Sequence, residues 1–271
     1  MEIVGSVALV TGANRGLGRE FVEQLRERGA KKVYAAARDT STITTPGVVP
    51  VALDVLDPES IERAAQQTGD VTLLVNNAGI ATGQNLIRGD LAEVRREMEV
   101  HFFGTLSVTR AFADILGGNG GGAVINVLSV LSWFSWDGAT SYSAAKAAEW
   151  SLTAGTRVEL AGQGTQVLGV HLGSAATDMT ADYDGPKLTP SEVVGATLDG
   201  LADGAVEVLA DEWSRTTKAG LAQDPAEFYA AAVRPIQKRT AFAAEGQEDG
   251  TGVRIRRDGV GPGPDRARAG R

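Results

Sequence analysis

Tyr142 and Lys146 are the residues of this chain whose types and spacing most directly suggest chemistry. Four positions apart, they would share one face of a helical turn. Ser129 precedes Tyr142 by thirteen residues, at the carboxyl end of an apolar run that predicts a strand. A phenol beside an ammonium can exchange a proton with an oxygen atom, and a serine hydroxyl can orient that oxygen. Such a pair is also compatible with plain packing and a solvated charge, so the surrounding motifs must decide whether it is catalytic.

The reaction that suits this trio is reduction of a carbonyl group or the reverse oxidation of an alcohol. The oxygen must gain a proton as hydride reaches the carbon, or lose one in the opposite direction. A free tyrosine titrates near about pH 10, too high for a base at neutral pH. We expect the ammonium of Lys146 and an oxidised nicotinamide to favour the phenolate, and lowering the pKa by ~3 units corresponds to about 4 kcal/mol.

A glycine-rich loop near the start of the chain is suited to binding a dinucleotide. The predicted strand at 7–10 leads into Gly12, Gly16 and Gly18, and a predicted helix follows. Gly12 can form the turn, Gly16 lets the backbone approach a pyrophosphate, and Gly18 lets the helix pack against the sheet. The phosphates would then lie at the positive end of the helix. A glycine loop alone can also be an ordinary strand-to-helix corner.

The elements that would position these residues alternate between strands and helices. This alternation predicts an α/β fold, a Rossmann-type doubly wound parallel sheet of about seven strands with helices on both faces. The predicted strands are 7–10, 32–37, 48–53, 73–75, 123–128, 167–172 and 206–209, and a long helix is predicted at about 91–116. We expect a single catalytic domain at 1–238 and a tail at 239–271, rich in Gly, Pro and Arg, that is disordered.

These motifs together resemble the short-chain dehydrogenase/reductase family. The run Thr11 to Gly18 matches its Thr-Gly-x-x-x-Gly-x-Gly cofactor motif, and Asn76 to Gly79 matches its Asn-Asn-Ala-Gly motif. Ser129, Tyr142 and Lys146 match its catalytic residues. Asp54 and Val55 match its adenine-contacting pair, and 173–177 matches its nicotinamide-binding loop. The resemblance covers about residues 3 to 212.

The resemblance implies which residues bind the cofactor. They are Gly12, Asn14, Arg15, Gly16, Leu17, Gly18, Arg38, Asp54, Val55, Asn77, Ala78, Gly79, Tyr142, Lys146 and Thr177. Lys146 is expected to hold the hydroxyls of the nicotinamide ribose as well as to act on Tyr142.

The end of the second strand indicates NADP(H) rather than NAD(H). An acid there would bind the ribose 2′-hydroxyl of NAD and repel a 2′-phosphate. The strand ends at Arg38, with no acid before Asp39, and Arg15 could reach a phosphate from the other side. A guanidinium suits phosphate well, although both arginines could simply be solvated.

Two positions depart from the family pattern. The family commonly has asparagine, which anchors a water chain to the lysine, where this chain has His101. His101 is therefore included among the catalytic candidates as a proton relay, and the alternative is a ring packed beside Phe102 and Phe103. Leu172 stands where the family usually has proline, from which we expect a small effect.

The substrate is only partly indicated. Trp133, Phe134 and Trp136 follow Ser129 and could wall an apolar or aromatic pocket, or could equally pack in the core or a subunit interface. Residues 179–188 resemble the family's mobile lid. The partner is thus expected to be a small carbonyl or alcohol, and the family suggests a homodimer or homotetramer.

Composition excludes several other classes of function. Among 271 residues there is no cysteine and there are only two histidines, so thiol nucleophiles and sites rich in Cys or His are excluded. The net charge is −8, and six Arg and two Asp at 252–271 make that end +4, leaving −12 for residues 1–251. Such an acidic body repels nucleic acid. With no targeting or membrane-spanning segment in the sequence, we expect a soluble, cytoplasmic protein.

The sequence thus predicts an NADP(H)-dependent oxidoreductase acting on a carbonyl or secondary alcohol, with Tyr142 as acid and base. Two alternatives remain open. One is an NADP(H)-binding regulatory protein that senses redox state without turnover. The other is an epimerase or dehydratase on the same fold.

Overall fold

The computed structural model of the chain describes residues 1–230. Residues Met1–Tyr229 form one compact unit. The predicted tail at 239–271 and the end of the predicted domain at 1–238 lie outside the described residues.

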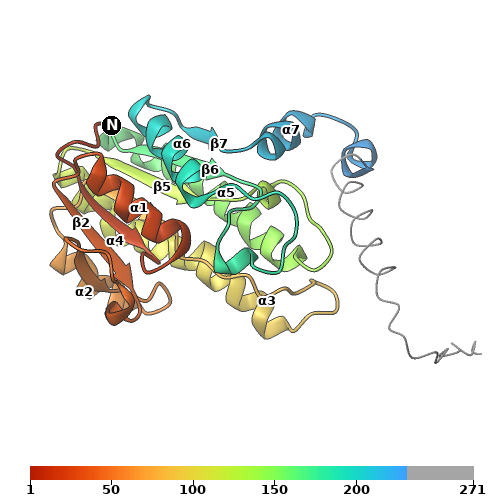
Figure 1. The fold of residues 1–271 in the computed structure, drawn as a ribbon, viewed down its shortest axis with the longest axis horizontal. Helices are drawn as coiled ribbons and strands as arrows, with labels where there is room; N and C mark the ends of the chain where they lie inside the picture. The colour runs from red at the N-terminus through yellow and green to blue at the C-terminus, as the bar shows by residue number, and fades with distance from the viewer. Residues whose placement is uncertain (231–271) are drawn as a thin grey trace, which may run out of the picture. The chain divides into compact units, whose positions relative to one another are not determined.

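A seven-stranded, wholly parallel sheet forms the centre of this unit, as predicted (Figure 1). Its strands are β1 (Val7–Thr11), β2 (Lys32–Ala37), β3 (Val49–Ala52), β4 (Leu73–Asn76), β5 (Ala123–Val127), β6 (Gln166–His171) and β7 (Glu207–Leu209). They lie in the order β3-β2-β1-β4-β5-β6-β7. The order reverses between β1 and β4, which is where ligands bind in open α/β sheets.

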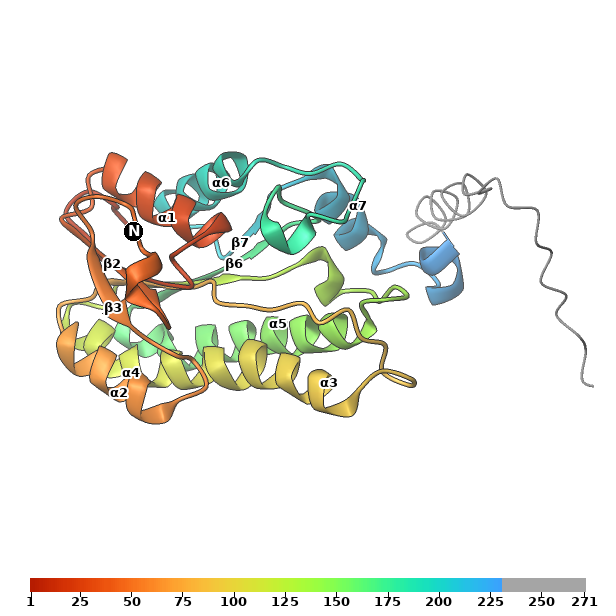
Figure 2. The ribbon, with the colours of Figure 1, turned by 60° about the horizontal axis from the view of Figure 1, so that its bottom comes forward.

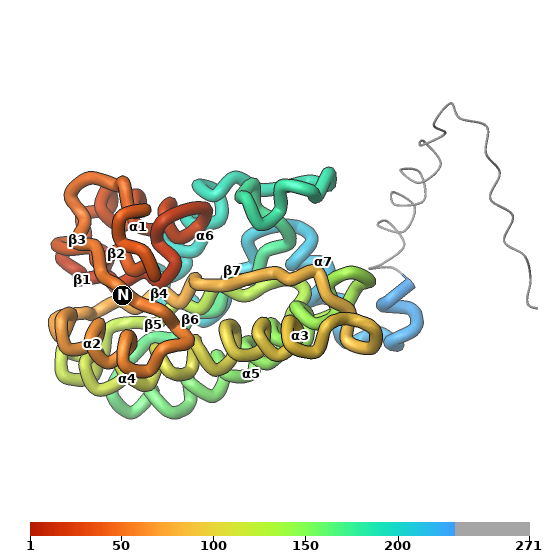
Figure 3. The backbone as a smooth tube through the Cα atoms, turned by 90° about the horizontal axis from the view of Figure 1, so that it is seen from below, coloured from red at the N-terminus to blue at the C-terminus, as the bar shows by residue number. Residues whose placement is uncertain are grey.

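Helices cover both faces of the sheet (Figure 2). Helices α1 (Gly16–Glu27) and α6 (Pro190–Ala202) pack together on one face. Helices α2 (Pro58–Gln67), α4 (Thr105–Gly118) and α5 (Thr140–Leu160) lie across the other, which Figure 3 shows from below. Successive strand residues point to opposite faces, so Val10 joins the apolar cluster under α1 while Leu9 joins the one under α4.

Helix boundaries follow the capping signals in the sequence. Asp57 caps α2, accepting a hydrogen bond from the backbone N–H of Glu59. Thr189 and Glu192 form a reciprocal capping box at the start of α6. Gly29, just after α1, has a φ of +87°, a conformation that ends helices and favours glycine.

The long helix predicted at 91–116 is divided into three segments. Helix α3 (Leu91–Met98) passes into a π-helical segment, η2 (Glu99–Gly104), which is followed by α4. Apolar periodicity does not distinguish one wide turn from regular helix, so the sequence did not indicate it. Such widened turns are frequent at functional sites, and His101 lies in this one.

Shorter elements complete the unit. Helix α7 (Glu212–Gly220) follows β7 and was not predicted; its N-terminus is capped by Asp211. Short 3₁₀ turns are η1 (Thr40–Thr42), η3 (Val130–Ser132), η4 (Ala161–Gln163) and η5 (Asp178–Thr180). Within residues 1–230, no helix combines the length and the apolar character needed to cross a membrane.

Candidate active site

A cleft of about 570 Å³ opens at the carboxyl ends of the central strands. It brings together nearly all of the predicted site residues, although they are spread from Gly12 to Thr177 in the sequence. Those that line it are Gly12, Asn14, Arg15, Gly16, Leu17, Arg38, Asp54, Val55, Asn77, Ala78, Gly79, His101, Ser129, Tyr142, Lys146 and Thr177. Gly18 is the exception, because it is buried behind the loop.

The glycine loop makes a tight turn that side chains would obstruct. Gly12 and Gly16 have φ values of +63° and +53°. A Cβ at Gly12 would lie 3.1 Å from the Cα of Ala78, and one at Gly18 would overlap the carbonyl oxygen of Gly12. The loop therefore presents bare backbone at the N-terminus of α1, as a pyrophosphate site requires.

Thr11 and Asn77 join the ends of β1 and β4. The Thr11 hydroxyl accepts hydrogen bonds from the backbone N–H groups of Asn77 and Ala78, both at 3.0 Å. The Asn77 side chain donates back to the carbonyl oxygens of Thr11 and Gly12, at 2.9 and 3.2 Å. These four bonds fix the glycine loop against the wall formed by 77–79.

The two arginines predicted to recognise a 2′-phosphate line the cleft, and both are exposed. Arg15 forms an ion pair with Asp178 at 3.2 Å, so its guanidinium already has an exposed partner. Asp39 directs its carboxylate to the N–H and hydroxyl of Ser41, and these bonds hold its pKa below the ordinary value. Asp39 thus serves as the cap of η1.

Ser129 and Tyr142 come from different elements and meet in the cleft. Ser129 follows β5 and caps η3, where its hydroxyl accepts a hydrogen bond from the N–H of Leu131 at 3.1 Å. Tyr142 lies in the first turn of α5 and is half-buried. The side chains of Ser129 and Tyr142 line the same cleft, and the Ser129 hydroxyl acts to lower the pKa of Tyr142, so both hydroxyls can reach one oxygen atom of a ligand.

Lys146 is buried one turn further along α5, with its ammonium 5.8 Å from the centre of the Tyr142 ring. It donates to the carbonyl oxygen of Val127 at 2.8 Å and to the carboxylate of Glu149 at 2.6 Å. Burial is the largest influence and opposes the charge of Lys146, yet Glu149 and Tyr142 together outweigh it and raise the pKa of Lys146. An ammonium has three N–H donors, so one remains for a ligand.

The protein around Tyr142 raises the pKa of its hydroxyl above the ordinary value. We expected Lys146 and an oxidised nicotinamide to lower that pKa, and Lys146 does act in the expected direction. Burial is the main cause, and the negative charge of Glu149 adds to it against the opposing effect of Lys146. Tyr142 is therefore protonated at neutral pH, in the form that donates a proton.

His101 packs behind Tyr142, with the two rings edge to face at 5.3 Å. Its Nε2 faces the backbone of Ile80, 2.7 Å from the carbonyl oxygen and 3.4 Å from the N–H. Its Nδ1 is buried without a hydrogen-bond partner in the described residues, 3.7 Å from the Glu149 carboxylate. Phe102 and Phe103, the packing partners considered for His101 in the sequence, lie edge to face with each other at 5.0 Å.

The far wall of the cleft is formed by 173–180. The N–H of Gly173 donates to the carboxylate of Asp211 at 2.6 Å, which restrains the chain directly after Leu172, the position where the family usually has proline. Ala175 pairs with Leu188, closing the base of the predicted lid. Met179 and Thr180 from this segment line the cleft.

The predicted aromatic wall is divided between two clusters. Trp133 stacks on His171 at 3.9 Å and contacts Trp150. Phe134 and Trp136 pack against Trp213 of α7, and Trp136 also contacts Tyr183 of the lid segment at 6.2 Å. The packing interpretation therefore accounts for Trp133 and Phe134, and Trp136 alone among the three reaches the lid.

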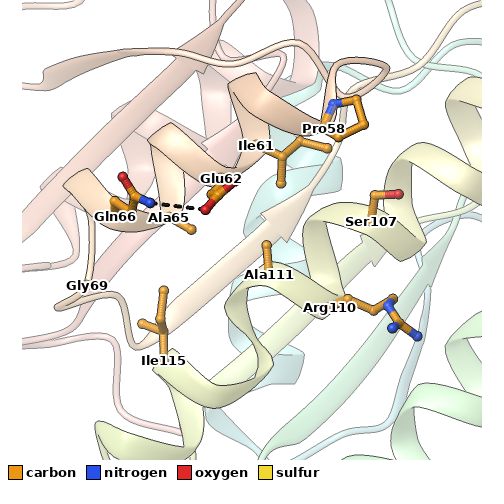
Figure 4. Close-up of a pocket in the computed structure, with 10 residues that line it drawn as sticks. All are labelled: Pro58, Ile61, Glu62, Ala65, Gln66, Gly69, Ser107, Arg110, Ala111 and Ile115. Atoms are coloured by element: carbon orange, nitrogen blue, oxygen red, sulfur yellow. Dashed lines mark hydrogen bonds between the residues drawn. The ribbon is translucent and has the colours of Figure 1, made fainter.

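A second hollow, of about 610 Å³, lies between α2 and α4 (Figure 4). Its floor is apolar, formed by Ile61, Ala111 and Ile115, and the one hydrogen bond drawn joins Gln66 to Glu62. Arg110 lies at its edge. No arrangement of acid, base and nucleophile occurs there among the described residues.

Some residues of the site were not identified from the sequence. Thr11 is one, because a hydroxyl that accepts two backbone N–H groups cannot be inferred without the fold. Glu149 is another, and it did have a signal: an acid three positions after Lys146 would lie on the same helical face.

Comparison with known proteins agrees with this geometry. Residues 6–187 match the family model described as short chain dehydrogenase. The chain is 35% identical over 189 residues to the 3-oxoacyl-(acyl-carrier-protein) reductase of Vibrio cholerae, covering 66% of this chain and 78% of that protein. It is 34% identical over 166 residues to carbonyl reductase (NADPH) 2 of Sus scrofa, covering 59% and 68%. A crystal structure of a short chain dehydrogenase from Burkholderia cenocepacia in complex with NADP is 42% identical, with a TM-score of 0.82 over 86% of this chain and 99% of that one.

Proposed function

The chain belongs to the short-chain dehydrogenase/reductase family and is an NAD(P)-dependent oxidoreductase, and from this we propose that it reduces a carbonyl group with NADPH, or oxidises the corresponding alcohol with NADP⁺. The observation that carries the proposal is the convergence of Ser129, Tyr142 and Lys146 in the cleft that begins at the glycine loop. A ligand oxygen that accepts hydrogen bonds from Ser129 and Tyr142 is in position to take a proton from Tyr142.

The cleft fits a dinucleotide. The bare turn at Gly12 and Gly16 leaves room that a Cβ would fill, and the N-terminus of α1 favours phosphate. Asp54 and Val55 would contact the adenine, Asn77 to Gly79 and Thr177 the middle of the cofactor, and Lys146 its ribose. Bound there, NADP(H) supplies or accepts the hydride.

The chain's own residues would handle the proton. In reduction, Ser129 hydrogen-bonds to the carbonyl oxygen, and Tyr142 gives its proton to that oxygen as the carbon receives hydride. The C=O double bond becomes a C–O–H single bond, and Tyr142 is left as phenolate. Lys146 stabilises the phenolate, which regains one proton from solvent with His101 as the relay. Oxidation reverses each step.

The preference for NADP(H) is assigned to Arg38, with help from Arg15. Charge-assisted bonds to a phosphate contribute about 1.5–3 kcal/mol each, and Asp39 is engaged by Ser41. The NADP bound to the similar Burkholderia protein supports this choice. Arg15 must leave Asp178 to take part, so Arg38 carries the larger share.

Replacing Arg38 by Asp should erase or reverse the preference, because a carboxylate repels the 2′-phosphate and binds a 2′-hydroxyl. Titrations of wild type and variant with NADPH and NADH provide the measurement. Equal binding of the two cofactors by wild type would show that Arg38 does not select the phosphate.

The substrate is proposed to be a small apolar or aromatic carbonyl compound. Trp136 against Tyr183 places aromatic surface beside the lid segment, and Met179 of that segment lines the cleft. The chain is also proposed to form a homodimer or homotetramer through α4 and α5, since Phe103, Trp150 and Val158 are exposed along η2 and α5.

Consumption of NADPH against a panel of aldehydes, ketones and diketones tests the function. Turnover of at least one apolar carbonyl compound, with alcohol as product, is expected. Tight NADPH binding with no turnover across the panel would instead favour a redox sensor, and conversion without net NADPH consumption would favour an epimerase or dehydratase.

A further inference from the structure

Glu149 is a buried carboxylate that the proposed reaction leaves without a role. It lies one turn after Lys146 on α5, and the side chains of the two residues are 2% and 6% exposed. One carboxylate oxygen accepts from the Lys146 ammonium at 2.6 Å, and the other from the hydroxyl of Thr105 at 3.1 Å. The first oxygen also lies 3.7 Å from Nδ1 of His101. The carboxylate therefore joins Lys146 to η2 and α4.

This ion pair changes the charge that Tyr142 experiences. A lone buried ammonium would strongly favour the phenolate, whereas a paired one presents almost no net charge. From the other elements packed against α5, the titratable groups nearby are His101 of η2, Glu97 of α3 and His171 of β6. Glu97 is a second carboxylate, held by Thr82 and Ser141. His171 is neutral at neutral pH, because burial lowers its pKa to about 4.

We propose that Glu149 is a positioning residue that pairs with Lys146 to fix its ammonium and to keep Tyr142 in the protonated form, so that the enzyme is set for reduction. The proposal depends on the proposed role of Tyr142. It explains why Lys146 points at both Val127 and Glu149: the two partners hold the ammonium in place while its third N–H stays free for a ligand.

Glu149→Gln tests the proposal, because it keeps the shape of the side chain and removes its charge. Without the counter-ion, Lys146 should stabilise the phenolate more strongly. The acidic limb of the pH profile for alcohol oxidation should move down by about one unit, which is a tenfold higher rate at a fixed pH on that limb. The alkaline limb for reduction should move down equally. Glu159→Gln is the matched control, since Glu159 is exposed on the same helix and should leave both limbs in place.

Unmoved limbs in Glu149→Gln would overturn the proposal. Because a buried Lys146 without its partner could prevent folding, a second measurement uses no Glu149 variant and no substrate. The tyrosinate absorbance of wild type minus that of Tyr142→Phe, followed against pH without cofactor, reports the state of Tyr142 directly. In wild type, tyrosinate from Tyr142 should appear only above about pH 10, where a free tyrosine titrates. Tyrosinate from Tyr142 below that pH would contradict the proposal even if the substrate panel succeeds, and its absence there would uphold the proposal even if the panel fails.

Discussion

At the scale of single residues, the site is a chain of contacts that runs inward from Tyr142. The phenol contacts the ring of His101, Lys146 lies beside it, and Glu149 joins Lys146 to the other side of His101. Nδ1 of His101 is buried without a hydrogen-bond partner among the described residues and lies 3.7 Å from the Glu149 carboxylate. This position makes Nδ1 the nitrogen that we assign to the proposed proton relay.

His101 variants should separate a relay from simple packing. His101→Asn retains an amide that can donate and accept, so it should keep substantial activity with a changed pH profile. His101→Ala should lose about tenfold or more, within the range typical of proton-transfer groups. A pH–rate series on both variants is the measurement. An alanine variant that matches wild type in rate and profile would show that the ring only packs.

At the scale of elements, the strands of the sheet could be predicted from the sequence, whereas two short helical segments could not. The seven strands were predicted, because hydrophobic runs act locally. The π-helical turn at Glu99–Gly104 was missed, since a segment of six residues is too short to be distinguished from regular helix by its apolar pattern. Helix α7 was missed as well, because it is short and mostly polar.

The same contrast holds within the site. The glycine loop and the pair of Tyr142 and Lys146 were identified, because their spacing is fixed by one turn or one helix. The raised pKa of Tyr142 was not, because it depends on burial and on Glu149 once α5 has packed against η2. Contacts between segments that lie far apart in the sequence cannot be inferred from a local sequence motif.

The close contact between α1 and the glycine loop predicts the effect of a larger residue at Gly18 on stability and on NADPH binding. Gly18→Ala places a Cβ against the carbonyl oxygen of Gly12, which is backbone and cannot yield without moving the loop. The variant should lose about 1–3 kcal/mol of stability, as overpacked sites do, and should bind NADPH more weakly. Denaturant unfolding and cofactor titration measure the two effects.

Gly155→Ala is the matched control on α5. No atom lies within 4 Å of a Cβ built there, so alanine should be neutral or stabilise the helix by about 0.4–1 kcal/mol. If Gly18→Ala behaves like Gly155→Ala in both measurements, the close packing of the loop on α1 is not required.

At the scale of the whole molecule, His171 links stability to pH. It is 1% exposed, its Nδ1 donates to the carbonyl oxygen of Ser129, and its ring stacks on Trp133. Burial lowers its pKa from 6.5 to about 4. The unfolded chain therefore binds a proton between these values that the folded protein does not, so stability falls as the pH drops through this window.

The loss attributable to His171 should approach about 3 kcal/mol by pH 4. Unfolding free energies of wild type and His171→Asn between pH 7 and pH 4 provide the measurement, since asparagine can still donate to Ser129 and does not titrate. The variant should show a shallower decline over this range. Parallel declines would indicate that His171 is protonated in the folded protein or that other groups dominate.

Tyr142→Phe tests the central claim most directly, because it removes one hydroxyl and leaves the ring packed on His101. NADPH affinity and the rate of carbonyl reduction are both measured on the wild type and on the variant. NADPH binding should stay nearly intact, while turnover falls by about 10²–10⁴-fold, the range that a positioned proton donor contributes. Unchanged turnover in Tyr142→Phe would contradict the account, since the proton would then reach the substrate oxygen without Tyr142.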